Sequence, residues 1–159
     1  MFWSFIYKPK MSTSAGELLE LRNVDTKACK HFTVKLETYA RVVNVHDGDT
    51  ITVIFKFGGS YCKFNVRLDG IDTAELHGEL SNIARKAKDR LAEFIGNSDN
   101  IVWLQCKGLD KYGRVLADVW DINKEVCFGK KLVDEHLAYE YHGKKKLTVA
   151  DQLKLLQTT

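Results

Sequence analysis

The sequence has almost no proline, with Pro9 as the single instance in 159 residues. Proline-rich and glycine-rich composition marks low-complexity or extended proteins, and this chain combines one proline with only 11 glycines. Apolar side chains make up 45% of the residues, which is enough to bury one core of ordinary size. We therefore expect one compact domain with short extensions.

Cysteine pairing signals are also absent. The four cysteines are widely spaced, with no C-x-x-C pair and no histidine at metal-ligand spacing beside them: Cys29, Cys62, Cys106 and Cys127. This pattern does not indicate a zinc site, and it favours reduced thiols in a cytosol-like compartment. Cys62 and Cys106 lie within apparent strands, where we expect them to be buried as small apolar residues.

Long hydrophobic runs are absent as well. The first ten residues, "MFWSFIYKPK", are apolar over residues 1–7. That segment lacks a leading basic region and is too short for a signal-peptide core or a membrane span. We therefore expect a soluble, intracellular protein, in a virion or host cell if the source is a virus. Residues 1–7 could instead pack on the domain or dock to another protein.

Charge of one sign is only slightly in excess. The formal net charge is +3 and the isoelectric point is about 8.6, which is compatible with a polyanionic partner but does not identify one. The basic run "GKKK" at residues 143–146 is typical of a solvated loop. An alternative hypothesis is that it contacts phosphates.

The order of secondary structure follows from side-chain periodicity. An N-terminal extension, residues 1–31, contains a linker at 12–16 and a short helix-compatible stretch at 17–23. Beyond it, β-branched and aromatic residues predict five strands, at residues 32–45, 50–57, 61–68, 100–108 and 114–122. Helical spacing of apolar residues predicts helices at 78–96, 130–138 and 148–157. This order is α+β and is compatible with a five-stranded, partly open OB barrel over residues 32–159.

Three polar stretches interrupt this pattern. "VRLDGIDTAEL" at residues 66–76 reads at first like a strand, yet it carries an arginine and three acids, which strand interiors disfavour. "HDGDT" at 46–50 is typical of a tight turn, and "DKYGR" at 110–114 is typical of a polar hairpin loop. Each stretch taken alone is ordinary.

The predicted meander brings two of these stretches together. If consecutive strands pair, Asp49 approaches Asp72, and two carboxylates without a cation between them repel each other. A hard divalent ion removes that repulsion, and Ca²⁺ prefers oxygen ligands such as carboxylates and main-chain carbonyls. Asp49 and Asp72 are therefore predicted metal ligands.

Arginines and one further acid accompany this pair. Arg67 precedes Asp72 by five residues, and Arg114 ends the second hairpin loop. Guanidinium groups bind phosphate in a bidentate manner, so two of them near an acidic metal site indicate a phosphodiester substrate. Glu75 lies just past the predicted metal ligands, where a carboxylate could orient or deprotonate an attacking water.

The segments "VHDGDTITV", "VRLDGIDTAEL" and "DKYGRVLADVW" closely resemble the three signature segments of the staphylococcal nuclease-like, or thermonuclease, family. The resemblance covers residues 33–141, in the same order and with similar spacing. That family is an OB-fold barrel with three helices. Its active members are Ca²⁺-dependent phosphodiesterases that cut both DNA and RNA, so the resemblance implies this activity here.

The resemblance also implies roles for individual residues near the metal. Asp49 and Asp72 match the carboxylates that bind Ca²⁺, and Thr73 matches the residue that offers its main-chain carbonyl. Ala74 stands where the family commonly has proline, so the turn before Glu75 loses a restraint on φ. We expect slower or looser catalysis at most.

The remaining matched positions face the substrate. Glu75 matches the family's proposed general base, and Arg67 and Arg114 match the pair that grips the scissile phosphate. Lys111 and Tyr112 match positions that contact a terminal phosphate and sugar. The family also stacks bases on aromatic residues near Tyr139 and Tyr141, but the match there is too poor to transfer a role.

These observations predict a monomeric, Ca²⁺-dependent nuclease without sequence specificity, acting on DNA and RNA. Single strands are the expected preference, because an OB groove suits splayed bases, and the resemblance implies 3′-phosphate products. A non-catalytic nucleic-acid-binding or interaction module of the same fold is the alternative. A structural component with a retained but shielded site is a third reading.

Overall fold

The computed structural model describes residues 14–143 and 145–156, so the docking segment proposed at residues 1–7 lies outside the described residues. The chain divides into two units, residues 1–32 and 33–159. The first contains helix α1 (Ala15–Arg22), which begins with a capping box between Ser14 and Glu17. None of the residues of α1 is buried.

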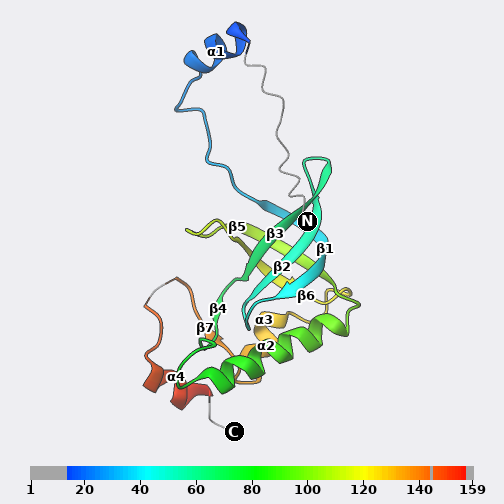
Figure 1. The fold of residues 1–159 in the computed structure, drawn as a ribbon, viewed down its shortest axis with the longest axis vertical. Coiled ribbons are helices and arrows are strands. Elements are labelled where there is room, and N and C mark those ends of the chain that lie inside the picture. Colours follow the sequence, from blue (N-terminus) through cyan, green and yellow to red (C-terminus); the bar gives the residue numbers. More distant parts are fainter. Residues whose placement is uncertain (1–13, 144, 157–159) are drawn as a thin grey trace, which may run out of the picture. The chain divides into compact units, whose positions relative to one another are not determined.

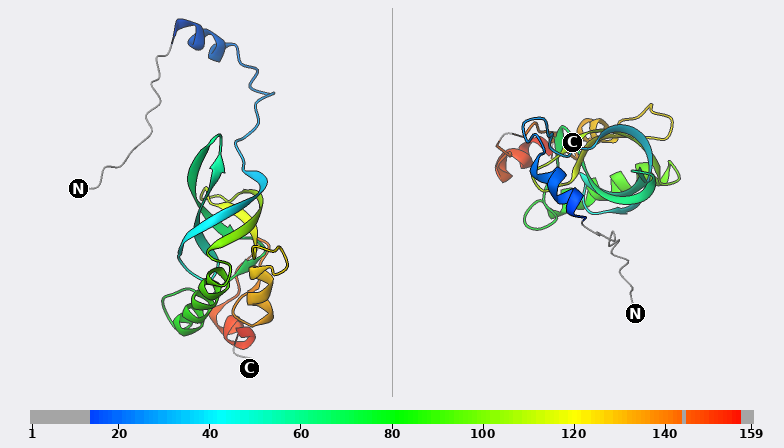
Figure 2. Two further views of the ribbon diagram at one scale, coloured as in Figure 1. Left: turned by 90° about the vertical axis from the view of Figure 1, so that its right-hand side faces the viewer. Right: turned by 90° about the horizontal axis from the view of Figure 1, so that it is seen from above.

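Five strands of the second unit close into a barrel (Figure 1). The strands are β1 (Lys35–Val45), β2 (Thr50–Phe57), β3 (Ser60–Leu68), β5 (Ile101–Leu109) and β6 (Val115–Trp120). Their order around the barrel is β1-β2-β3-β6-β5, with β3 and β6 parallel and the other neighbours antiparallel. The view along the barrel shows the strands as a ring (Figure 2). The predicted five-stranded OB-type α+β fold is therefore confirmed.

The β2–β3 hairpin shows how the sequence builds this barrel. The side chains of Ile51, Val53 and Phe55 alternate with outward ones along β2 and are at most 1% exposed. Gly58 and Gly59 connect the strands with φ of 57° and 87°. Two residues with positive φ form the turn whose twist matches that of paired strands.

Three helices gather at one end of the barrel (Figures 1 and 2). They are α2 (Ser81–Gly96), α3 (Phe128–Asp134) and α4 (Val149–Leu156). The buried face of α2 consists of Ala84, Ala87, Leu91 and Ile95, which recur at helical spacing. Stacked rings of Phe94 and Phe128, with centroids 5.5 Å apart, join α2 to α3. No helix among the described residues is both long enough and apolar enough to cross a bilayer.

The structure corrects several predicted boundaries. Helix α2 begins at residue 81 rather than 78, and α3 covers 128–134 rather than 130–138. His136, with φ of 54°, follows the end of α3, and the chain then forms strand β7 (Tyr139–Glu140). β7 pairs with β4 (Ile71–Asp72) in a separate small sheet. Strands of two residues carry no periodicity, so the sequence does not reveal them.

All four cysteines are free thiols. Cys106 is buried, as predicted, but the prediction for Cys62 is wrong because its side chain is only half-buried. Inward positions of β3 become fully buried only from Val66 onward, since the hairpin end of the strand extends beyond the covered core.

Candidate active site

One cleft collects every residue that the sequence singled out for chemistry. Its volume is about 910 Å³. It lies beside the start of β2 and the end of β3, and β4, the β5–β6 loop and the chain before α4 complete its walls. All eight predicted metal, catalytic and substrate positions line it: Asp49, Arg67, Asp72, Thr73, Glu75, Lys111, Tyr112 and Arg114. The fold therefore brings together residues from three separate sequence motifs.

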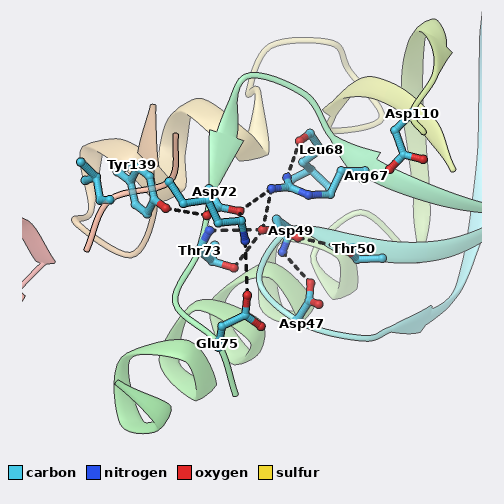
Figure 3. Close-up of polar contacts among 12 residues, drawn as sticks. Asp47, Asp49, Thr50, Arg67, Leu68, Asp72, Thr73, Glu75, Asp110 and Tyr139 are labelled. Atoms are coloured by element: carbon cyan, nitrogen blue, oxygen red, sulfur yellow. Dashed lines mark hydrogen bonds and ion pairs between the residues drawn. The ribbon is translucent and has the colours of Figure 1, made fainter. Parts of the chain in front are cut away.

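A buried charge cluster, consisting of Asp49, Arg67 and Asp72, forms the floor of the cleft (Figure 3). Nη2 of Arg67 lies 2.7 Å from Oδ1 of Asp72 and 3.0 Å from Oδ2 of Asp49. Nη1 of Arg67 donates to the main-chain oxygen of Leu68 at 2.7 Å. All three charged residues are buried. The guanidinium group is thus fixed between two carboxylates.

Asp49 is held in place from several directions. Its carboxylate accepts hydrogen bonds from the amide of Thr73 at 3.2 Å, the hydroxyl of Thr73 at 3.1 Å and the hydroxyl of Thr50 at 2.9 Å. Burial raises the pKa of Asp49 to about 6, and the charge of Arg67 opposes that shift. Asp47 shapes the same turn, since its Oδ1 accepts from the amide of Asp49 at 3.0 Å.

Gly48 lets this turn lie directly on helix α2. A Cβ at residue 48 would be 2.7 Å from Cβ of Ala87 and 2.9 Å from Cγ2 of Thr73. Both distances are shorter than van der Waals contact, so no larger residue fits without movement. The glycine of the "HDGDT" motif therefore sets the position of Asp49, in addition to any role in the turn.

Asp72 has three donors around its carboxylate. The hydroxyl of Tyr139, on β7, donates to Oδ2 of Asp72 at 2.5 Å. Tyr139 is 3% exposed, and burial together with this hydrogen bond raises its pKa. Its hydroxyl positions Asp72 and its ring is buried, so the ring does not offer a stacking surface. Tyr141, two residues later, does line the cleft.

Lys146 is a functional candidate for which the sequence gave only a general hint. Its Nζ lies 3.2 Å from Oδ1 of Asp72 and 3.3 Å from Oε1 of Glu75. Its side chain is 52% exposed, whereas that of Asp72 is 2% exposed. The polar run that contains Lys146 has no periodicity from which such a contact could be predicted. The basic run at residues 143–146 supported only the hypothesis that it contacts phosphates.

Glu75 projects into the open part of the cleft. Its side chain is 81% exposed, and Oε1 contacts the ammonium group of Lys146. The preceding residue, Ala74, is 3% exposed and packs in a small apolar cluster with Leu80, Ala84 and Leu156. This packing against α2 and α4 restrains the turn at the position where the family commonly has proline.

Arg114 reaches the cleft from the β5–β6 loop. Its Nε lies 2.7 Å from Oδ2 of Asp110, and its amide donates to Oδ1 of Asp110 at 2.9 Å. Its Nη1 lies 3.4 Å from the hydroxyl of Thr50. Burial acts to raise the pKa of Asp110, but the hydrogen bonds from Arg114 and Tyr112 outweigh it and lower that pKa. Asp110 therefore positions Arg114, a role that the sequence did not reveal.

Lys111 and Tyr112 form the outer rim of this part of the cleft. The Tyr112 side chain is largely exposed, and the ammonium group of Lys111 lies 4.9 Å from the centre of its ring. Cζ of Arg114 lies 5.5 Å from the same ring. Two cations and an exposed ring are thus available to a ligand that carries both a phosphate and a flat base or sugar.

The donors on the cleft floor suit a hard cation. Asp49 and Asp72 supply carboxylate oxygens, which a hard cation prefers, and Asp47 lines the same cleft. No group of three or more His, Cys, Asp or Glu side chains within residues 14–143 and 145–156 is arranged to hold a metal ion. A divalent ion here would need main-chain carbonyl and water oxygens as well, which is ordinary for Ca²⁺.

The comparison with protein families agrees with this geometry. The model of the staphylococcal nuclease homologue family matches residues 65–159, which is more than half of the chain. The chain belongs to this family. A comparison with curated proteins gives no significant match. As a staphylococcal nuclease homologue, the chain has a nuclease-type domain, which is built on the five-stranded barrel.

The family match covers most of the site but not all of it. Arg67, Asp72, Glu75 and Arg114 lie within the matched range, whereas Asp49 lies before it. Asp49 joins the site through its contacts with Arg67 and Thr73 in the folded chain. The structure therefore adds Asp49 to the site residues that lie within the family match.

We predict that Gly48→Ala destabilises the protein by about 1–3 kcal/mol, the usual cost of overpacking. The added methyl group would press on Ala87 and Thr73 and push the turn that carries Asp49 away from Arg67. Thermal or denaturant unfolding measures this loss of stability. Any activity that depends on the position of Asp49 in the cleft should fall as well.

Gly96→Ala is the matched control. Gly96 is the last residue of α2, and nothing lies within 4 Å of a Cβ added there. This substitution should leave stability unchanged or raise it slightly, because alanine favours helix. Equal effects of the two substitutions would show that Gly48 has no special contact with the helix.

Proposed function

We propose that this protein is a Ca²⁺-dependent nuclease that hydrolyses the phosphodiester bonds of DNA and RNA without sequence specificity. The observation that supports the proposal most is the convergence of Arg67 and Arg114 on a cleft whose floor carries two buried carboxylates. Guanidinium groups suit a phosphate, and the carboxylates suit a divalent cation.

Asp49, Asp72 and the main-chain carbonyl of Thr73 would hold the metal. Ca²⁺ bound there would supply positive charge to a non-bridging oxygen of the scissile phosphate. The protein prepares this position, since Thr73 and Thr50 orient Asp49 while Tyr139 orients Asp72. Nη2 of Arg67 and Nζ of Lys146 contact the same carboxylate oxygens, so both groups would have to shift when a metal binds.

The two arginines would neutralise charge that develops on the phosphoryl group during in-line attack. Arg67 is buried and rigid, because two carboxylates and a main-chain oxygen hold its guanidinium group. Arg114 is partly exposed and is oriented by Asp110. Its place at the outer side of the cleft suits a group that also assists the leaving 5′ oxygen, which would yield 3′-phosphate products.

Glu75 would act as the general base. Its exposed carboxylate can accept a proton from a water molecule that enters the open cleft, and Oε1 can hold that proton while the new phosphorus–oxygen bond forms. Lys146 contacts the same Oε1 and therefore keeps Glu75 close to Asp72 before the substrate binds.

Single strands are the proposed substrates. Phosphate contacts carry no base information, so cutting without sequence preference is the natural result of this site. The exposed ring of Tyr112 at the rim can stack on an unpaired base, which a stacked duplex does not offer. Location in a soluble compartment and a monomeric state remain predictions.

We predict that Glu75→Gln lowers the rate of cleavage of a fluorescent single-stranded DNA in Ca²⁺ by about 10²–10⁴-fold. The amide keeps the size of the side chain but cannot accept the proton. Cleavage by the unaltered protein should also stop when a chelator removes the metal. Because Glu75 is exposed, folding should not change.

Glu79→Gln serves as the control, since Glu79 is exposed and lies four residues away, outside the residues that line the cleft. It should cut at the normal rate. If the folded, unaltered protein binds the strand but does not cut it in Ca²⁺, the proposed nuclease activity is wrong. The protein would then be a non-catalytic binding module.

We predict that Arg114→Lys lowers turnover by about 10²–10³-fold, the usual cost of losing one electrostatic donor in the transition state. Lysine keeps the charge but cannot reproduce the bidentate grip or the pairing with Asp110. The steady-state rate on the same DNA measures the loss. As a control, Arg85→Lys on the exposed face of α2 should leave the cleavage rate unchanged. Near-normal turnover by Arg114→Lys would show that Arg114 has no role in the mechanism.

A further inference from the structure

Both carboxylate oxygens of Asp72 already contact donors. Oδ1 lies 2.7 Å from Nη2 of Arg67 and 3.2 Å from Nζ of Lys146. Oδ2 accepts the hydrogen bond from the hydroxyl of Tyr139 (Figure 3). The Asp72 side chain is only 2% exposed, so little of it remains open to solvent. A metal ion can therefore bind Asp72 only if at least one of these donors moves away.

Lys146 is the donor that can leave most easily. Tyr139 is buried, and the guanidinium group of Arg67 is also held by the main-chain oxygen of Leu68 and by Asp49. Arg67 can therefore shift only a little, and its departure would leave buried charges unpaired. The Lys146 side chain is 52% exposed and has a flexible four-carbon stem, so its ammonium group can turn into solvent.

The main chain on both sides of Lys146 is anchored. The amide of Tyr141 donates to the main-chain oxygen of Gly70 at 2.8 Å. On the other side, Nε2 of Gln152, a buried residue of α4, donates to the main-chain oxygen of Leu147 at 3.0 Å. Release of the ammonium group therefore needs rotation of one side chain and no movement of α4 or β7.

The same ammonium group also occupies the proposed general base. Nζ of Lys146 lies 3.3 Å from Oε1 of Glu75. One flexible cation thus contacts both a proposed metal ligand and the carboxylate that would accept the proton of water. While this contact persists, Lys146 competes with water for Oε1 of Glu75, and it competes with a metal ion for Oδ1 of Asp72.

Charge balance favours an exchange of Lys146 for a divalent cation. The contacts join five charged side chains: Asp49, Asp72 and Glu75 with Arg67 and Lys146. Three negative charges face two positive ones, so one negative charge is left over. If a divalent ion replaced the single charge of Lys146, the positive and negative charges would be equal. Buried charges persist only when they are paired, so this balance stabilises the exchanged state.

We propose that Lys146 is an internal cation that keeps the cleft inactive until a divalent cation displaces it. In the metal-free protein its ammonium group pairs with Asp72 and Glu75, and it leaves both carboxylates when Ca²⁺ binds. Glu75 is then available to water. The inference rests on the proposed nuclease function, because it describes the regulation of that site. Lys146 sets the Ca²⁺ concentration at which cutting begins.

We predict that Lys146→Gln binds Ca²⁺ about tenfold more tightly than the unaltered protein in calorimetric titration, within the usual range of coupling between two binding events. Glutamine removes the competing charge, and a damaged fold would not produce a gain in affinity. The Ca²⁺ concentration that gives half-maximal cutting should fall by the same factor. Lys146→Arg keeps a cation at this position and should bind Ca²⁺ no more tightly than the unaltered protein.

Lys145→Gln is the matched control. It removes the same charge from the neighbouring residue, which is exposed and is not among the residues that line the cleft. Its affinity for Ca²⁺ should stay close to that of the unaltered protein. An equal gain in both variants would show that net charge, rather than the contact of Lys146 with Asp72, sets the affinity, and the inference would be wrong.

Displacement can also be observed in the unaltered protein. Brief acylation with an amine-reactive reagent, followed by mass spectrometry, measures how fast each lysine reacts. Lys146 should react severalfold faster in saturating Ca²⁺ than in chelator, because its ammonium group has left the carboxylates. Lys145 should react at the same rate in both conditions.

Two results separate this inference from the nuclease proposal. If the unaltered protein binds Ca²⁺ and cuts single-stranded DNA, but Lys146→Gln binds Ca²⁺ no more tightly and Ca²⁺ does not change the labelling of Lys146, the inference is wrong and the nuclease proposal stands. If the unaltered protein neither binds Ca²⁺ nor cuts DNA, both are wrong.

Discussion

The ion pairs of Arg67 with Asp49 and Asp72 determine the arrangement of the cleft. Removing charges from water is costly, and buried carboxylates persist only when they are paired and hydrogen-bonded. Here one guanidinium group serves two carboxylates from segments 23 residues apart, the turn before β2 and the strand β4. Loss of the arginine would leave two like charges facing each other in a buried site.

Other contacts depend on this arrangement and extend it. Tyr139 ties Asp72 to β7, and Lys146 ties it to the chain before α4. Gly48 allows the turn of Asp49 to lie on α2. Four segments that are distant in sequence are thereby fixed around one cleft, and the exposed groups at its rim, Glu75 and Tyr112, remain free of dense packing.

Much of the site could be predicted from the sequence because its key residues lie in short motifs at strand ends. A meander brings Asp49 and Asp72 together whatever the details of packing, and the β5–β6 hairpin loop brings Arg114 to the same end of the barrel. The five strands were likewise visible, since alternation in β2 and β3 is regular. These features depend on local pattern and on simple connectivity.

The rest depends on tertiary contacts that no local pattern encodes. Strands β4 and β7 are each two residues long and exist only because they pair with each other. The hydrogen bond of Tyr139 joins residues 67 positions apart, and the contact of Lys146 with Glu75 joins residues 71 apart. Asp110 was within a recognised motif, yet its role in orienting Arg114 follows only from the loop geometry.

The most direct test of this account is calorimetric titration of the folded protein with Ca²⁺, compared with Asp72→Asn and with the more exposed Asp118→Asn. The account predicts that the unaltered protein and Asp118→Asn bind one Ca²⁺ per chain, and that Asp72→Asn, if shown to be folded, does not. Equal Ca²⁺ binding by all three proteins, or none by the unaltered one, would contradict the assignment of the buried carboxylates as a metal site.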